Sequence, residues 1–150
     1  MPTLLIVHHT PSPALQEMFT AVLEGATDPE IEGVDVIRRP ALAATTVDVL
    51  GADGVLLGTP TNIGYMSGAL KHFFDQVYYP CVDAGHGTPY GLYVHGGMDT
   101  AGAVRAVQSI TKGMGWQPVR VPVEVTGVPN RVDLHACREL GATIAATLMN

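Results

Sequence analysis

The chain has 150 residues, of which 47% are hydrophobic and 15% charged, and its formal net charge is −6. This composition excludes a disordered chain, and the acidic excess argues against a broad nucleic-acid face, which needs cations to displace phosphate counterions. No apolar run approaches the roughly 18 residues of a membrane span, and the N-terminus lacks a signal-peptide pattern. Cys81 and Cys137 form no disulfide or metal-ligand pattern. We therefore expect one cytoplasmic domain over residues 1–150, without a metal site, a nucleic-acid partner or a membrane span.

Strands and helices alternate along the chain. We expect, in order, a strand over 4–7, a helix over 15–25 ending at Gly25, a strand over 34–37, a short helix within 41–52, a strand over 55–57, a helix from 70 that ends at Pro80, a strand over 90–94, a helix over 104–114, a strand over 119–125 and a helix over 134–148. The strands over 4–7 and 55–57 are continuous apolar runs, as in strands buried on both faces, whereas the helices show apolar residues at i, i+3, i+4 and i+7. In the fifth strand valines alternate with other residues, so one face is buried, and Pro122 places this strand at the sheet edge because it cannot donate to a ladder.

This alternation predicts an α/β fold of three layers. Strands separated by helices form a parallel sheet with helices on both faces, and five strands in this length fit the doubly wound order 2-1-3-4-5. Ligands of such sheets bind beyond the carboxyl ends of the strands, where the order reverses between strands one and three. The loops at 8–15, 59–66 and 95–101 therefore become the candidate site.

The first of these loops contains two hydroxyls before a helix N-terminus. Thr10, Ser12 and the neighbouring amides are typical of an anion site, and the loop has no Lys or Arg, so neutral donors would hold a phosphate. The alternative is that Thr10 and Ser12 only cap the helix. We expect one of His8 and His9 to pack beside this loop and the other to meet solvent.

The other two loops favour a flat heteroaromatic ligand. Residues 58–71 combine a Gly/Pro/Asn-rich turn, which presents backbone amides, with the apolar Ile63 and the aromatic Tyr65. Gly96 and Gly97 expose backbone N–H groups at the end of the fourth expected strand, where they could line the edge of a ring. Asp99 is expected to cap the helix that follows.

The string from Thr59 to Gly68 (TPTNIGYMSG), with Leu70-Lys71 and Phe74-Asp75 after it, resembles the flavodoxin-like FMN proteins. The resemblance is to the NAD(P)H-dependent FMN reductases and the WrbA-type quinone reductases. It implies a flavodoxin-like three-layer sandwich, FMN as cofactor, NAD(P)H as electron donor and a quinone or similar small acceptor. These families often form homodimers or homotetramers, and no residue here decides the oligomeric state.

The resemblance also implies which residues contact FMN. The phosphate contacts fall on Thr10, Ser12, Pro13, Ala14 and Leu15, the ring contacts on Pro60, Thr61, Asn62, Ile63, Gly64 and Tyr65, and the contacts on the other side of the ring on His95, Gly96, Gly97 and Asp99. The chain departs from the family pattern where Pro13, Ala14 and Leu15 replace Gly, Asn and Thr. No catalytic side chain is expected, because the cofactor performs the chemistry.

Two other functions stay open. One is a non-enzymatic flavodoxin-type electron carrier, for which the negative charge would suit basic partners. The other is a relative that has lost FMN, because the phosphate loop departs from the family pattern. A phospho-receiver domain shares the strand order, but this chain has His8 and His9 where receivers need acidic residues, and Asp53 lies at the wrong end of its strand.

Overall fold

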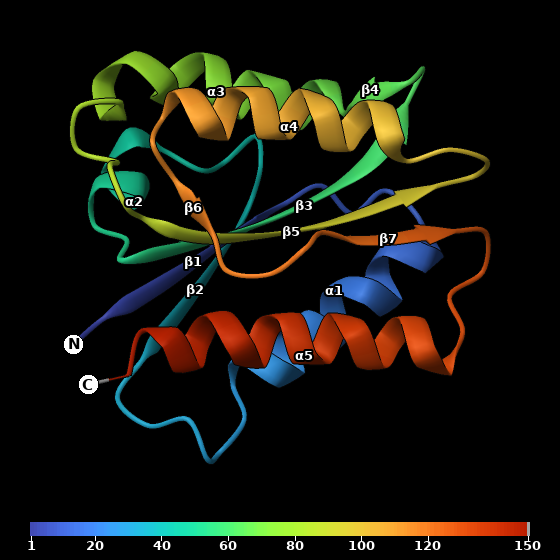
Figure 1. The fold of residues 1–150 in the computed structure, drawn as a ribbon, viewed down its shortest axis with the longest axis horizontal. Helices are drawn as coiled ribbons and strands as arrows, with labels where there is room; N and C mark the ends of the chain where they lie inside the picture. Colours follow the sequence, from blue (N-terminus) through green and yellow to red (C-terminus); the bar gives the residue numbers. More distant parts are fainter. Residues whose placement is uncertain (150) are drawn as a thin grey trace.

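One parallel sheet lies between two layers of helices (Figure 1). A computed structural model describes residues 1–149. The strands are β1 (Thr3–His8), β2 (Asp35–Pro40), β3 (Gly54–Asn62), β4 (Tyr65–Met66), β5 (Pro89–Gly96), β6 (Gln117–Pro118) and β7 (Val123–Thr126). The helices are α1 (Pro13–Ala26), α2 (Thr46–Leu50), α3 (Gly68–Cys81), α4 (Ala101–Gly113) and α5 (Arg131–Thr147). Helices α3 and α4 cover one face of the sheet, and α1 and α5 cover the other.

The order of the sheet confirms the predicted topology. The strands run β2-β1-β3-β5, and both β6 and β7 pair with β5 on its far side. All of these pairs are parallel, whereas β4 pairs antiparallel with β3. The short strand β4 was not predicted.

The fifth predicted strand is divided in two, which corrects the prediction of one strand over 119–125. Strands β6 and β7 flank a break in which Val121 is 83% exposed. Two prolines bracket this break, and a proline has no N–H for a ladder. Arg120 instead reaches α5, where its guanidinium lies 3.3 Å from a carboxylate oxygen of Glu139. The predicted position of this segment at the sheet edge is confirmed, but residues 119–125 do not form one strand with a regularly buried face.

Helix α1 continues through Gly25, which was predicted to end it. A Cβ on Gly25 would lie 1.9 Å from the carbonyl oxygen of Arg138 in α5, and one on Gly141 would lie 2.0 Å from that of Val22 in α1. The two glycines therefore let the helix backbones touch. Gly25 is a packing residue and not a helix stop.

Two further helix boundaries differ from the predictions. Helix α3 includes Pro80 and ends one residue later, at Cys81, because the missing N–H of a proline removes only a single helical bond. Helix α2 covers only 46–50 of the 41–52 stretch. It begins at a capping box in which the side chains of Thr45 and Asp48 each accept a hydrogen bond from the other residue's amide.

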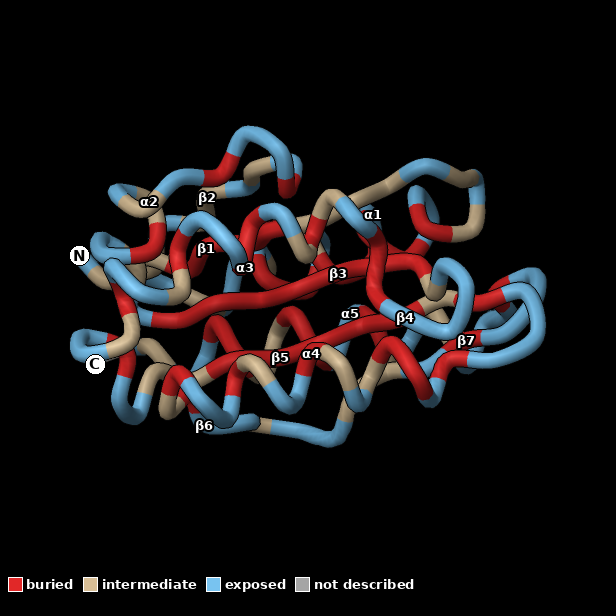
Figure 2. Tube along the Cα trace, turned by 90° about the horizontal axis from the view of Figure 1, so that it is seen from above, coloured by how far each residue is buried: buried red, intermediate tan, exposed pale blue. Residues whose placement is uncertain are grey.

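The sheet separates two apolar cores. Strands β3 and β5 are buried along most of their length (Figure 2), as the continuous apolar run over 55–57 predicts for β3. Cys81 and Trp116 are buried on the α3/α4 face, and Cys137 on the α1/α5 face. Burial raises the pKa of Cys81, and it raises that of Cys137 to about 12, so both thiols stay protonated near neutral pH. None of the helices in residues 1–149 is long and apolar enough to cross a membrane.

Candidate cofactor site at the carboxyl edge of the sheet

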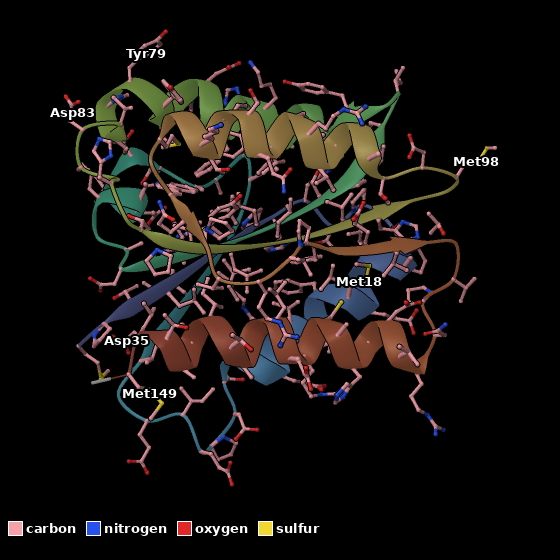
Figure 3. The ribbon with its side chains drawn as sticks, in the orientation of Figure 1. Met18, Asp35, Tyr79, Asp83, Met98 and Met149 are labelled. Carbon is pink, nitrogen blue, oxygen red and sulfur yellow. The ribbon has the colours of Figure 1, made fainter. Side chains whose placement is uncertain are left out.

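The three predicted loops meet at one edge of the sheet. Strands β1, β3 and β5 are parallel, with His8 opposite Gly58 and Pro60 opposite His95, so their carboxyl ends lie together. The N-termini of α1 and α4 lie at the same end of the molecule (Figure 1). Met98, at the tip of the third loop, points away from the protein (Figure 3).

In the first loop, Ser12 caps α1. Its hydroxyl oxygen accepts a hydrogen bond from the amide of Leu15 at 3.3 Å, and Pro13 occupies the start of the helix. The side chain of Leu15 is buried in the core, so only its backbone belongs to the loop. The capping function is therefore real, but the hydroxyl proton of Ser12 is not used in this bond and can still be donated.

His8 packs beside the loop, as expected for one of the two histidines. Its ring stacks on Phe19 of α1, with centroids 4.1 Å apart and planes at 24°. Its Nδ1 lies 2.7 Å from the Thr10 hydroxyl oxygen. Burial, with smaller contributions from Arg38 and His9, lowers the pKa of His8 to about 4, so the ring is neutral near pH 7.

His9 does not simply meet solvent. Its amide donates to the carbonyl of Gly58 at 3.0 Å, which joins the start of the loop to β3. Its ring is partly buried, and its Nδ1 is a buried atom without a hydrogen-bond partner within residues 1–149.

The second loop is a hairpin between β3 and β4. Ile63 and Gly64 form its turn, with φ of 51° and 71°. Two consecutive positive φ values are typical of a type I′ turn, which prefers Asn-Gly. Ile63 is a β-branched residue in the left-handed region with its side chain fully exposed, and this choice of residue hid the hairpin from sequence reasoning.

Buried hydroxyls support the base of this hairpin. The Thr59 hydroxyl accepts from the amide of Ser67 at 3.0 Å and donates to the carbonyl of Pro60 at 2.8 Å. The Ser67 hydroxyl in turn accepts from the amide of Leu70 at 3.2 Å and caps α3. The hydroxyl of Thr61 is buried but has no hydrogen-bond partner in the described chain, so a polar group is left over beside the hairpin.

The side chains nearer the tip of the hairpin are open to solvent. Asn62 is exposed and Tyr65 is 41% exposed, whereas Pro60 is buried. The second loop therefore has buried residues at its base, the unpartnered Thr61 hydroxyl next to them and three exposed side chains, Asn62, Ile63 and Tyr65, toward its tip.

Side chains tie the third loop to the edge strand. The Nε2 of His95 lies 2.7 Å from the carbonyl oxygen of Gly127, and the Thr100 hydroxyl donates to Glu124 of β7 at 2.8 Å. The Asp99 carboxylate accepts from the amide of Ala101 at 3.1 Å, but the N-cap residue of α4 is Thr100, whose side chain makes no capping bond, so Asp99 is not the cap that the sequence predicted. Sequence reasoning missed Glu124 and Thr100, because the two lie 24 residues apart and no local pattern links them.

The hairpin and the third loop have a fixed spacing. A Cβ on Gly102, in the first turn of α4, would lie 1.9 Å from the carbonyl oxygen of Gly64. A Cβ on Gly96 would lie 2.1 Å from the carbonyl oxygen of Asp99, whereas one on Gly97 would meet open space. The backbone of Gly97 is therefore free to approach a ligand.

The residues at this edge fit FMN. Thr10, Ser12 and the N-terminus of α1 offer neutral hydrogen-bond donors of the kind that a phosphate needs, and the Thr61 hydroxyl is a buried polar group without a partner in residues 1–149. Exposed apolar and glycine surfaces on the second and third loops suit the faces of a flat ring. Within residues 1–149, no group of three or more His, Cys, Asp or Glu side chains could hold a metal ion.

A protein-family model, described as NADPH-dependent FMN reductase, matches residues 12–130. The chain belongs to this family. The match covers most of the chain, including the second and third loops, and confirms the resemblance found in the TPTNIGYMSG string. A curated relative, a flavodoxin from Aquifex aeolicus (strain VF5), is 39% identical over 77 residues, which cover 51% of this chain and 40% of the relative. The match therefore spans less than half of that relative's length.

Solved structures confirm the flavodoxin-like fold of this FMN reductase family member. An archaeal flavodoxin is 20% identical, with a TM-score of 0.81 and coverage of 97% of this chain and 98% of its own. A WrbA-like flavodoxin from Agrobacterium tumefaciens is 18% identical, with a TM-score of 0.74 and coverage of 98% and 96%. The rubredoxin oxygen:oxidoreductase of Desulfovibrio gigas is 19% identical, with a TM-score of 0.81, and the match covers 97% of this chain but 36% of that chain.

Proposed function

We propose that this chain binds FMN at the carboxyl edge of its sheet and acts as an NAD(P)H-dependent oxidoreductase for a quinone or similar small acceptor. The observation that carries the proposal is the meeting of three loops that hold neutral donors and a Thr61 hydroxyl without a partner in residues 1–149, in a member of the NADPH-dependent FMN reductase family. One sheet with helices on both faces supports a single domain.

The first loop would hold the phosphate. The hydroxyls of Thr10 and Ser12 and the amide of Ala14 lie around the N-terminus of α1, where the helix dipole favours an anion. Pro13 contributes only its position, because it has no N–H, and the amide of Leu15 is engaged by Ser12. No lysine or arginine lies in this loop, so no cationic side chain of the loop would neutralise the negative charge of the FMN phosphate.

The second and third loops would hold the ring. Pro60, Thr61, Asn62, Ile63, Gly64 and Tyr65 would form one wall, and His95, Gly96, Gly97 and Asp99 the other. His95 and Asp99 already bond to backbone atoms, which supports a role in holding the loop and not in moving protons. When bound, FMN supplies the ring that takes a hydride from a nicotinamide and passes electrons to the acceptor.

An absorption spectrum tests the cofactor. The purified protein is incubated with FMN, freed of unbound flavin and scanned for the visible flavin bands. NAD(P)H oxidation is then followed with and without a benzoquinone. The proposal expects retained flavin and quinone-dependent oxidation, and it fails if the protein neither retains FMN nor oxidises NAD(P)H when FMN is supplied.

A flavodoxin-type electron carrier is the second candidate. The sequence identity to a flavodoxin over half of the chain and the net charge of −6 favour it. A carrier would retain FMN yet oxidise NAD(P)H only when a separate reductase is added, whereas the proposed enzyme needs no second protein. The same assay, with and without a flavodoxin reductase, distinguishes the two.

A further inference from the structure

The first loop has few phosphate donors, because prolines interrupt it. Pro11 and Pro13 have no N–H, and the amide of Gln16 is bonded to the carbonyl of Ser12 at 3.0 Å. The loop also has no cation. If a phosphate binds here, the hydroxyls of Thr10 and Ser12 must contribute more than they would in a loop with a full set of amides.

The hydroxyls of Thr10 and Ser12 differ in what fixes the direction of their protons. The oxygen of Ser12 accepts from an amide, which can only donate, so the Ser12 proton is free to point outward. The oxygen of Thr10 faces Nδ1 of His8 at 2.7 Å, and a histidine nitrogen can be either donor or acceptor. The tautomer of His8 therefore decides whether the Thr10 proton is used inside the protein or offered outside it.

His8 has little freedom apart from its tautomer. The ring is stacked on Phe19 and half-buried, so a change of rotamer would break the packing between β1 and α1. Burial, and the nearby Arg38 and His9, keep the ring neutral near pH 7, so it carries one proton on one of two nitrogens. With the proton on Nε2, the Thr10 hydroxyl donates to Nδ1 and turns a lone pair outward, which repels an anion.

We propose that His8 is a positioning residue: its Nδ1–H form donates to the Thr10 oxygen and so directs the Thr10 proton toward the FMN phosphate. This inference rests on the proposed function, because it requires a phosphate at the N-terminus of α1. It assigns to His8 a role beyond packing, and it explains how a loop with two prolines and no cation can hold a phosphate.

Paired affinities for FMN and riboflavin test this role, since riboflavin lacks the phosphate. His8→Phe keeps an aromatic ring on Phe19 but removes Nδ1, and Thr10→Val removes the hydroxyl. Thr10→Val should weaken FMN binding roughly tenfold, as loss of a hydrogen bond to a charged group does, and His8→Phe should weaken it by a smaller factor, because the hydroxyl remains but loses the bond that orients it. Both should leave riboflavin binding within about twofold of wild type. The double variant should bind FMN no more weakly than Thr10→Val, because the two residues act through one bond.

Two further variants serve as controls. His8→Asn restores an N–H donor on a shorter side chain, so it should recover part of the FMN affinity lost in His8→Phe. His72→Phe, at an exposed position of α3, should change neither affinity. Equal loss of FMN and riboflavin affinity in His8→Phe would mean a purely structural role, and unchanged FMN affinity would also overturn the proposal.

Nitrogen-15 NMR of the histidine rings gives a second readout on the wild-type protein, which is independent of whether the variants fold. In the FMN complex the Nδ1 of His8 should carry the proton, and a persistent Nε2–H form would overturn the proposal. A wild type that binds neither flavin would instead contradict the proposed function. Binding of FMN with no change in His8→Phe would contradict only the role of His8.

Discussion

The β1–α1 loop and the β3–β4 hairpin meet at the same edge of the sheet but are built in opposite ways. The loop directs its polar side chains inward: Ser12 caps a helix and Thr10 bonds to His8. The hairpin keeps its polar support at its base and extends a fully exposed Ile63 at positive φ. Side-chain hydrogen bonds therefore hold the loop and the base of the hairpin, whereas backbone geometry shapes the tip of the hairpin. The four predictions below separate these two modes.

The largest effect is expected where the hairpin touches α4. Gly102→Ala should destabilise the protein by about 1–3 kcal/mol and weaken FMN binding, because the new Cβ would overlap the carbonyl oxygen of Gly64. Helix propensity alone gives the opposite sign, since alanine replaces a helical glycine. Gly97→Ala is the matched control and should be close to neutral in stability. Urea unfolding measures both, and a stabilised Gly102→Ala would show that the contact is loose.

The loop should respond to pH through His8. The folded-state pKa of His8 is lowered from 6.5 to about 4. As the pH falls, His8 therefore takes up a proton in the unfolded chain at a higher pH than in the folded protein. Stability linked to His8 is therefore fully present above pH 6.5 and is lost as the pH falls toward 4. His8→Phe should flatten the fall in the free energy of unfolding over this window, as measured by urea titrations at several pH values. An equally steep fall in the variant would assign the dependence to other groups.

The two capping serines compare the loop and the hairpin directly. Ser12→Ala and Ser67→Ala should each cost about 1 kcal/mol of stability, because each removes the side-chain cap of a helix. Only Ser12→Ala should also weaken FMN more than riboflavin binding, since Ser67 is fully buried at the base of the hairpin. Flavin titrations and thermal unfolding provide the test. If Ser12→Ala weakens FMN and riboflavin binding equally, the FMN phosphate does not bind at Ser12.

The smallest effect is expected at the tip of the hairpin. Ile63→Asn should stabilise the protein by about 0.5–1 kcal/mol, because asparagine tolerates positive φ and the exposed isoleucine side chain loses no packing. Ile63→Val keeps the β-branch and should leave stability unchanged. If Ile63→Asn is less stable in urea, the isoleucine makes contacts that outweigh its backbone strain.

The pattern of apolar residues was enough to predict the strand order and the three loops of the site. Continuous apolar runs such as 4–7 identify strands buried on both faces, and the position of each run gives the loop that follows it. The serine caps and the resemblance in TPTNIGYMSG are also local signals. The boundaries at Gly25 and Pro80 were wrong, because a glycine or proline has the same local preference whether it ends a helix or packs within one.

By itself, the sequence determined the α/β class, the parallel order of the sheet, the meeting of the three loops at one edge of the sheet and the family. These follow from hydrophobic periodicity and short motifs, which involve neighbours along the chain. Only the tertiary structure decided the division of the edge strand, the turn at Ile63, the Thr100–Glu124 bond and the stack of His8 on Phe19. Each of these depends on which distant residue fills a given space, and no local pattern of residue types contains that information.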